Sequence, residues 1–236
     1  MKDYRWRLTN KVKRVLRNKC PVVLIAGPQM GKSHMVQLIR ESQTPVRILE
    51  DVETHHIPSL LERPNPTLIT TGINSLYGSV EYKEQCFRVP LTTIMDKHIS
   101  RWSTVDWNAT HGHPALASSS NELLRKRIQK RLAQSWEKSL YDHPQAYEVL
   151  LSIREHHASP VEHYQRLRKT YGKELKPILD WLVCLGAIHR QKYKGGAGIT
   201  ATPMHPIQTG SLRPHGHLSH FPSAHVSYGL PNQLNI

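Results

Sequence analysis

Cysteine is scarce in this sequence of 236 residues, and the three that occur, Cys20, Cys86 and Cys184, stand far apart. No C-x-x-C pair is present, which argues against a zinc ribbon or a redox dithiol. Unpaired cysteines favour a reducing compartment. The sequence also lacks a signal-like apolar segment near its start and any run of about 20 apolar residues that would cross a bilayer. We therefore expect a cytoplasmic protein with no membrane partner.

Acidic residues are few: 18 Asp and Glu stand against 32 Lys and Arg, a formal net charge of +14. This excess favours an anionic partner, with nucleic acid ahead of an acidic membrane surface. The alternative is a basic protein that binds no polyanion. The apolar fraction of 38% suffices for a core, and the length suits one large or two modest domains.

Four short apolar segments alternate with helical ones in the first 95 residues. The run Val22–Ala26 is continuously apolar and β-branched, which is typical of a strand buried on both faces. Further strands are expected at 46–49, 67–71 and 86–89. This alternation predicts a parallel α/β sheet. A basic amphipathic helix over 3–18 either covers the edge of this domain or contacts a polyanion.

A phosphate-binding loop follows the first strand: Ala26-Gly27-Pro28-Gln29-Met30-Gly31-Lys32-Ser33. In the pattern G-x-x-x-x-G-K-[ST], backbone N–H groups surround the phosphates, the lysine reaches the terminal ones and the hydroxyl binds Mg²⁺. Gly31 permits close approach of the backbone, and Ala26 replaces the usual first glycine. The eight residues therefore predict a site for a nucleoside triphosphate, taken here as ATP.

Hydrolysis would require a carboxylate near Mg²⁺ and another that positions water. Glu50 and Asp51 end the second strand and are the acidic pair placed to serve, with Asp51 joining Ser33 as a magnesium ligand. The alternative is an ordinary solvated strand end. Thr70 and Thr71 end the third strand and are candidates to contact the terminal phosphate or the water, Thr71 as a catalytic residue, although threonine is also a common strand residue.

The second half of the sequence reads as helical and then as a small separate unit. A helix rich in Arg and Lys is expected over 121–140, and Asp142-His143-Pro144 marks a boundary. Ser159-Pro160 has the composition of a helix start, and a third helix carries apolar residues from Leu175 to Val183. A hairpin with a glycine-rich tip follows. The tail from 204 is expected to be disordered, and metal binding by its histidines is a compositional alternative.

In this order, the segments resemble the AAA+/STAND group of P-loop ATPases, specifically the small modules followed by a winged helix. The resemblance makes 26–33 the Walker A motif, 48–51 the Walker B motif and 70–72 the sensor strand. It makes His113 and Pro114, within Gly112-His113-Pro114, nucleotide-binding residues that open the lid. The implied domains are an ATPase core (1–106), a helical lid (107–142), a winged helix (143–203) and a tail (204–236).

One departure from this family concerns the distance between motifs. Only 17 residues separate Lys32 from Glu50, too few for the usual intervening strand and helix. The missing strand lies at the sheet edge in this family, so we expect a reduced, four-stranded core. The deletion and the inverted acidic pair bear on hydrolysis more than on binding. Arg63 and Arg101 are the candidates for an arginine finger.

The resemblance implies an ATP-driven switch that binds DNA through its winged helix. In that mode the third helix enters the major groove. The residues available for such contacts are Lys173, Lys176, His189, Arg190, Lys192 and Lys194. Winged helices also serve as protein contacts, so a nucleotide-gated adaptor is the alternative, and a third possibility is an ATPase-like protein that holds ATP as part of its structure. Family members often assemble, which makes a homo-oligomer possible.

Overall fold

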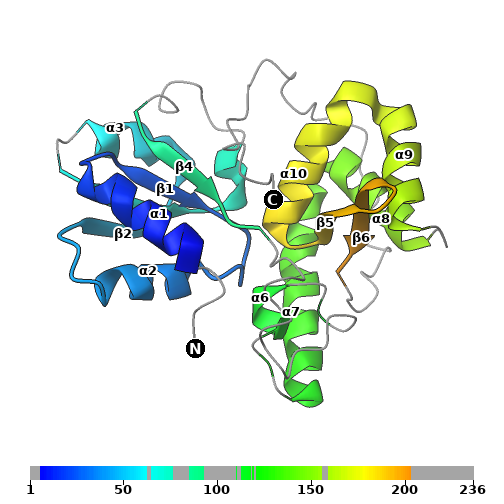
Figure 1. Ribbon diagram of the computed structural model, residues 1–236. Coiled ribbons are helices and arrows are strands. Elements are labelled where there is room, and N and C mark those ends of the chain that lie inside the picture. Colours follow the sequence, from blue (N-terminus) through cyan, green and yellow to red (C-terminus); the bar gives the residue numbers. More distant parts are fainter. Residues whose placement is uncertain are drawn as a thin grey trace.

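The computed structural model describes residues 6–62, 65–76, 85–92, 110, 113–117, 119, 121–155 and 159–202, and every structural statement below concerns these residues. Four parallel strands form one sheet in the order β2–β3–β1–β4 (Figure 1). They are β1 (Val22–Ile25), β2 (Arg47–Val52), β3 (Thr67–Thr71) and β4 (Phe87–Pro90). The prediction of a four-stranded parallel α/β sheet is confirmed.

Strand β1 lies between β3 and β4, which explains its continuously apolar sequence. All of its residues are buried, and its side chains alternate between the two faces of the sheet. Val22 and Leu24 belong to one hydrophobic cluster, whereas Val23 and Ile25 belong to another. The first cluster is completed by α1 (Trp6–Arg17) and α2 (Lys32–Arg40), which cover that face. Helix α1 therefore covers the core with its apolar side. This agrees with the interpretation that the basic helix covers this domain.

Helices make up most of the remaining chain. The other face of the sheet, which carries the second cluster, is covered by α3 (Ile57–Leu61), which follows η1 (Thr54–His56), and by η2 (Ile73–Leu76). Helices α6 (Pro114–Ala117) and α7 (Glu122–Tyr141) follow, and the Asn121 side chain accepts a hydrogen bond from the Leu123 N–H to cap α7. No described helix combines the length and the apolar composition that crossing a membrane requires.

Residues 144–202, called here the C-terminal module, contain three helices and a hairpin. The elements are α8 (Pro144–Glu155), α9 (Pro160–Tyr171), η4 (Gly172–Glu174), α10 (Leu175–Leu185), β5 (Ile188–Tyr193) and β6 (Gly196–Ala201). Ser159 and Glu162 form a reciprocal capping box at the start of α9, so the predicted helix start is confirmed. Gly186 ends α10 in the left-handed conformation, with φ 84°.

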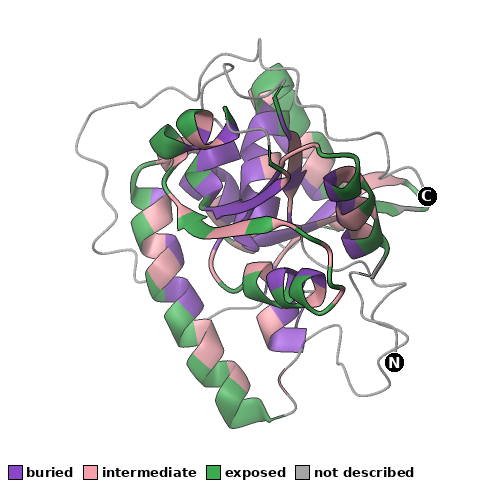
Figure 2. Cartoon of the chain, turned by 90° about the vertical axis from the view of Figure 1, so that its left-hand side faces the viewer, coloured by how far each residue is buried: buried purple, intermediate pink, exposed green. Residues whose placement is uncertain are grey.

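The second hydrophobic cluster runs without interruption from the sheet into the C-terminal module. It contains Ile25 and Ile69 of the sheet together with Trp136 of α7 and Trp181 of α10. Figure 2 shows buried residues continuing from the strands into the helices beside them. The sheet and the module therefore share one core, and the turn at 142–144 does not separate two cores. The predicted disordered tail at 204–236 lies outside the described residues.

Candidate nucleotide site

The predicted phosphate-binding loop leaves the sheet at its centre. It connects the carboxyl end of β1 to the first residue of α2, Lys32. Gln29 and Gly31 both have positive φ, 58° and 87°, and these two reversals turn the chain sharply before the helix begins. No side chain caps α2. Because the first N–H groups of a helix have no partner within it, the loop presents backbone donors at a positive helix end.

Lys32 reaches back across the carboxyl edge of the sheet. Its Nζ donates to the Thr71 carbonyl at 3.3 Å and lies 3.1 Å from Asp51 Oδ1. The Lys32 side chain is 19% exposed and that of Asp51 is 80% exposed. The structure thus brings together three predicted elements: the loop lysine, the end of β3 and one of the two acidic residues.

Glu50 and Asp51 point to different partners. Strand β2 does not end before them but continues to Val52, and its pairing with β3 shifts register between Leu49 and Val52. Asp51 occupies this irregularity with φ 52°, and its N–H donates to Thr70 Oγ1 at 2.8 Å. Glu50 accepts from Arg40, at the far end of α2, at 2.6 Å. Of the expected acidic pair, Asp51 thus lies against Lys32, whereas Glu50 lies against Arg40.

The hydroxyl of Thr71 is directed into the protein. Thr71 is buried, its Oγ1 donates to the Val52 carbonyl at 2.6 Å, and it shares a second hydrogen bond of 2.8 Å with Ser75 Oγ. These bonds hold the end of β2 against β3. The structure thus does not present this hydroxyl to the loop, and Thr71 meets Lys32 through its carbonyl alone.

The end of α10 contacts the first half of the loop. The Gly27 N–H donates to the Cys184 carbonyl at 2.9 Å. A Cβ on Gly27 would lie 2.9 Å from Leu185 Cα and 3.0 Å from its carbonyl oxygen, so only glycine fits here. This contact joins residues far apart in sequence, and the sequence reasoning missed it; the only local signal is the glycine beside Ala26.

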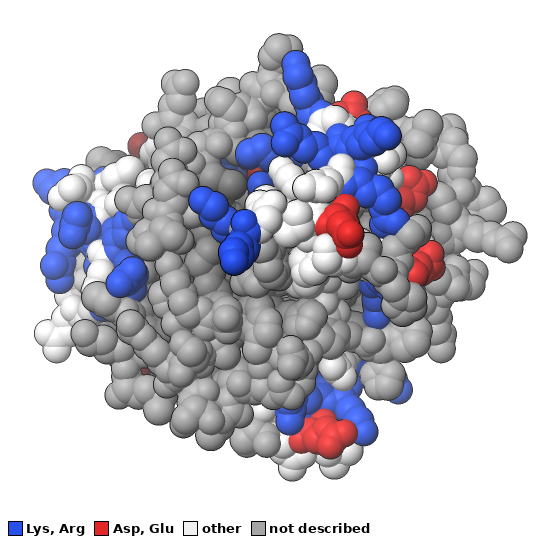
Figure 3. All heavy atoms as spheres, turned by 45° about the vertical axis from the view of Figure 1, so that its right-hand side comes forward, with Lys and Arg blue, Asp and Glu red and all other residues white. Residues whose placement is uncertain are grey.

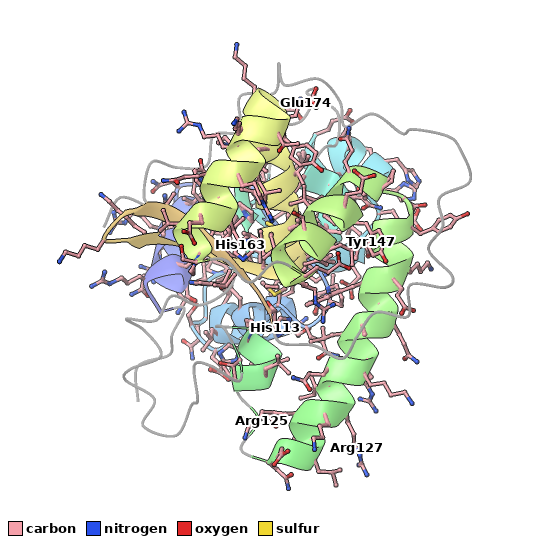
Figure 4. All side chains as sticks on the ribbon, turned by 90° about the vertical axis from the view of Figure 1, so that its right-hand side faces the viewer. His113, Arg125, Arg127, Tyr147, His163 and Glu174 are labelled. Atoms are coloured by element: carbon pink, nitrogen blue, oxygen red, sulfur yellow. The ribbon has the colours of Figure 1, made fainter. Side chains whose placement is uncertain are left out.

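A second contact involves Gly186, the residue that ends α10. A Cβ there would lie 2.6 Å from Met30 Sδ and 2.9 Å from His113 Nε2. Met30 and His113 are fully buried, and the His113 ring lies 6.3 Å from that of Trp136. Figure 4 shows His113 near the middle of the molecule, directly above α6. The loop, the start of the predicted lid and the C-terminal module thus meet at one point.

The remaining predicted nucleotide-site residues vary in accessibility. Ala26 is buried, Pro28 is partly buried and Gln29 and Ser33 are exposed. Pro114 opens α6 and is buried. Gly112 and the two candidates for an arginine finger, Arg63 and Arg101, lie outside the described residues. Ser33 and Asp51 are the predicted magnesium ligands, and both are accessible to solvent.

A second group of possible metal ligands lies just beyond β2. Glu53, His55 and His56 offer ligand atoms within 4.8 Å of one another, and all three are exposed. His55 Nδ1 already lies 3.5 Å from Glu53 Oε2, and the two histidine rings are 3.9 Å apart. These contacts account for the grouping without an ion.

The predicted DNA-contacting residues of the C-terminal module are only partly on its surface. Lys173, Lys176, Lys192 and Lys194 are exposed, and Arg190 is half-buried. His189 is buried, so its inclusion among surface contacts was wrong. Its neighbours on β5 are Ile188, which is also buried, and Arg190, which is half-buried.

The chain matches no protein-family model, no curated protein and no solved structure.

Proposed function

We propose that this protein is a cytoplasmic ATP-binding switch whose C-terminal module contacts DNA. The observation that carries the nucleotide half is the start of α2. Left-handed Gly31 sets this helix directly behind the central strand, and its first turn has no side-chain cap. Backbone donors at a positive helix end are the groups that bind phosphate oxygens in nucleotide sites.

Lys32 and its neighbours fit a magnesium nucleotide. Asp51 is largely exposed, so its ion pair with Lys32 is weak and readily exchanged for an interaction with phosphate. In this proposal Gly31, Lys32 and Ser33 hold the phosphates, while Ser33 and Asp51 hold Mg²⁺. Bound Mg²⁺ supplies positive charge that offsets the charge of the phosphate oxygens.

Hydrolysis has weaker support than binding. A second carboxylate is needed to orient the attacking water, but Glu50 is paired with Arg40 and the Thr71 hydroxyl is engaged with Val52 and Ser75. We therefore expect slow turnover, and a protein that holds ATP without turning it over stays an alternative. Turnover that is unchanged in Glu50→Gln would agree with the placement of Glu50.

The contact between α10 and the loop supports a switch. The hydrogen bond from Gly27 to Cys184 and the tight packing of Gly186 connect the loop to the C-terminal module. A nucleotide shifts such a contact only if it binds one arrangement more tightly than the other. ATP binding would then change how the module is held and, through it, the affinity for DNA.

A nucleotide-gated adaptor that binds protein is the second candidate. Leu123 and Leu124, in the first turn of α7, are 59% and 48% exposed. Exposed leucines side by side are a feature of protein contacts, including those between copies of one chain. Nucleotide-dependent co-purification of a partner in the absence of DNA, lost in Leu123→Asn/Leu124→Asn, would favour this function over DNA binding.

The nucleotide half is tested by titrating magnesium ATP into the wild type, Lys32→Ala and Lys130→Ala, with heat as the readout. Lys130 is exposed on α7, so its variant makes the same change in charge away from the loop. A charge-assisted hydrogen bond contributes about 1.5–3 kcal/mol, so Lys32→Ala should weaken binding by roughly 10- to 100-fold. Lys130→Ala should bind like the wild type. A wild type that binds no ATP would exclude the proposal.

A further inference from the structure

Helix α10, the third helix of the C-terminal module, is packed in a way that rules out base reading in a major groove. Nine of its eleven residues are buried, and only Lys176 and Asp180 reach solvent. A helix that reads bases must present several side chains on one free face. DNA contact by this module must therefore involve side chains of other elements as well.

A pocket of about 630 Å³ opens between α9, η4, the start of α10 and β5. Four of the side chains that line it are cationic: Arg168, Lys173, Lys176 and Arg190. Tyr164 of α9 forms part of its wall. The pocket is wide enough for a nucleotide-sized group. Four consecutive elements of the module thus place four cationic side chains around one hollow.

The positive charge of this pocket is only partly compensated. Asp180 accepts from Lys176 at 2.9 Å and from Arg190 at 3.4 Å. In the described part of the chain, no ion pair involves Arg168 or Lys173. Asp180 therefore pairs with two of the four cations, and Arg168 and Lys173 add positive charge that attracts an anion.

Arg190 is held in place before any ligand arrives. Asp180 binds one side of its guanidinium group, and the Tyr164 ring centroid lies 5.7 Å from Arg190 Cζ. A cation over an aromatic face is attracted by the ring. Fixing a charged side chain in advance lowers the entropy lost when an anion binds. Arg190 is thus a positioned part of the pocket, whereas Arg168 and Lys173 are its unpaired charges.

The surroundings of the pocket favour a long polyanion over a membrane. Figure 3 shows Lys and Arg side chains gathered over the upper right part of the face that it displays, with Asp and Glu side chains at the margins of that group. Lys192 and Lys194 are also exposed at the hairpin. The large apolar side chains exposed in the described part of the chain lie on α7, so none beside the pocket would enter a lipid layer. Nucleic acid carries regularly spaced phosphates that match such a surface.

We infer that this pocket holds backbone phosphate of DNA, with Arg168 and Lys173 contacting phosphate directly and Asp180 positioning Lys176 and Arg190. The inference rests on the proposed function, in which the C-terminal module contacts DNA, and names the surface that does so. Since phosphate contacts carry no sequence information, binding is independent of sequence and falls with salt. In this mode the module contacts the DNA backbone and makes no base-specific contacts.

The test measures the affinity of the protein for two labelled DNA duplexes of unrelated sequence. Fluorescence anisotropy is the readout, at several salt concentrations. The full chain is compared with Arg168→Gln/Lys173→Gln and with Arg127→Gln/Lys130→Gln on α7, which changes the net charge equally. All four side chains are exposed, and melting curves check that each variant folds. The pocket variant should bind about tenfold or more weakly, and its salt slope should fall by about 1 for each lost contact.

The outcomes separate this inference from the proposed function. Equal losses in the pocket and α7 variants, or no loss in the pocket variant, would overturn the inference while DNA binding stands. A preference of several orders of magnitude for one duplex would also overturn it, because backbone contacts cannot supply that. If the wild type binds neither duplex, the DNA half of the proposed function fails, and ATP binding is judged separately by the Lys32→Ala titration.

Discussion

At the carboxyl edge of the sheet, the groups proposed to bind a ligand belong mainly to the backbone, whereas on the C-terminal module they are long charged side chains. The loop after β1 relies on two residues with positive φ and an uncapped helix start. The pocket of the module relies on four cationic side chains, two of which pair with Asp180. Backbone donors at fixed positions suit compact phosphate recognition, whereas flexible cations suit a long polymer whose position can vary.

These two regions differ in chemistry but are mechanically joined. One hydrophobic cluster includes strand residues of the sheet and the tryptophans of α7 and α10. At the end of α10, the Cys184 carbonyl also accepts a hydrogen bond from the Gly27 N–H of the loop. Because the two regions share a core and touch at the loop after β1, we expect a change in one region to affect the stability of both. Three variants test this, from the largest expected effect to the smallest.

The largest effect is expected from Trp181→Ala in α10. Trp181 is fully buried, and replacing a buried tryptophan with alanine costs about 3–5 kcal/mol in free energy of unfolding. Because the core is shared, urea unfolding followed by far-UV circular dichroism should show one transition shifted to lower urea. Tyr141→Ala, at an exposed site, should change stability by about 0.5 kcal/mol or less. Two separate transitions, only one of them shifted, would show that the regions unfold independently.

A smaller effect is expected at the contact between the loop and α10. Gly27→Ala places a methyl group 2.9 Å from Leu185 Cα, and such overpacking costs about 1–3 kcal/mol. Gly72 follows β3 on the same edge of the sheet, but nothing lies within 4 Å of an added Cβ. In thermal unfolding, Gly27→Ala should therefore have a lower melting temperature than Gly72→Ala, and Gly72→Ala should melt close to the wild type. Equal stability of the two variants would argue against the contact.

The smallest effect concerns pH and His143, which joins α7 to α8. Its ring packs edge-on against Trp181 at 4.6 Å, and burial lowers its pKa below the ordinary 6.5, partly opposed by Asp142. The unfolded chain therefore takes up the proton first as pH falls, so stability present above about pH 6.5 is lost below it. His143→Phe removes this titration while keeping a ring.

The pH dependence is checked by urea unfolding at a series of pH values between about 5 and 8. The free energy of unfolding of the wild type should drop relative to that of His143→Phe below the ordinary histidine pKa. A constant difference between the two proteins across this range would show that burial does not disfavour the charged ring.

Local features were predictable from the sequence because their causes are local. The apolar run at 22–26 predicted a buried strand, and Ser159-Pro160 predicted a helix start within one residue. The strand, turn and helix around 26–33 followed from the order of the residues there. In each case neighbours within a few positions determine the conformation.

The arrangements that escaped prediction depend on contacts between distant residues. The extension of β2 to Val52 requires the hydroxyls of Thr70 and Thr71, which hold the irregular turn at Asp51 and so separate it from Glu50. The seat of α10 on Gly27 and the burial of His189 arise only from packing. For the same reason the sequence placed DNA contacts on α10, although its apolar residues fill the core.

The most direct test of the proposed switch is the DNA affinity of the wild type and of Lys32→Ala, measured with and without magnesium ATP. If the loop and the C-terminal module are coupled, ATP should change the DNA dissociation constant of the wild type by about 5- to 150-fold, the usual range of such coupling. Lys32→Ala should bind DNA equally with or without ATP. Identical DNA affinity of the wild type in both conditions, at ATP concentrations that saturate the loop, would contradict the account.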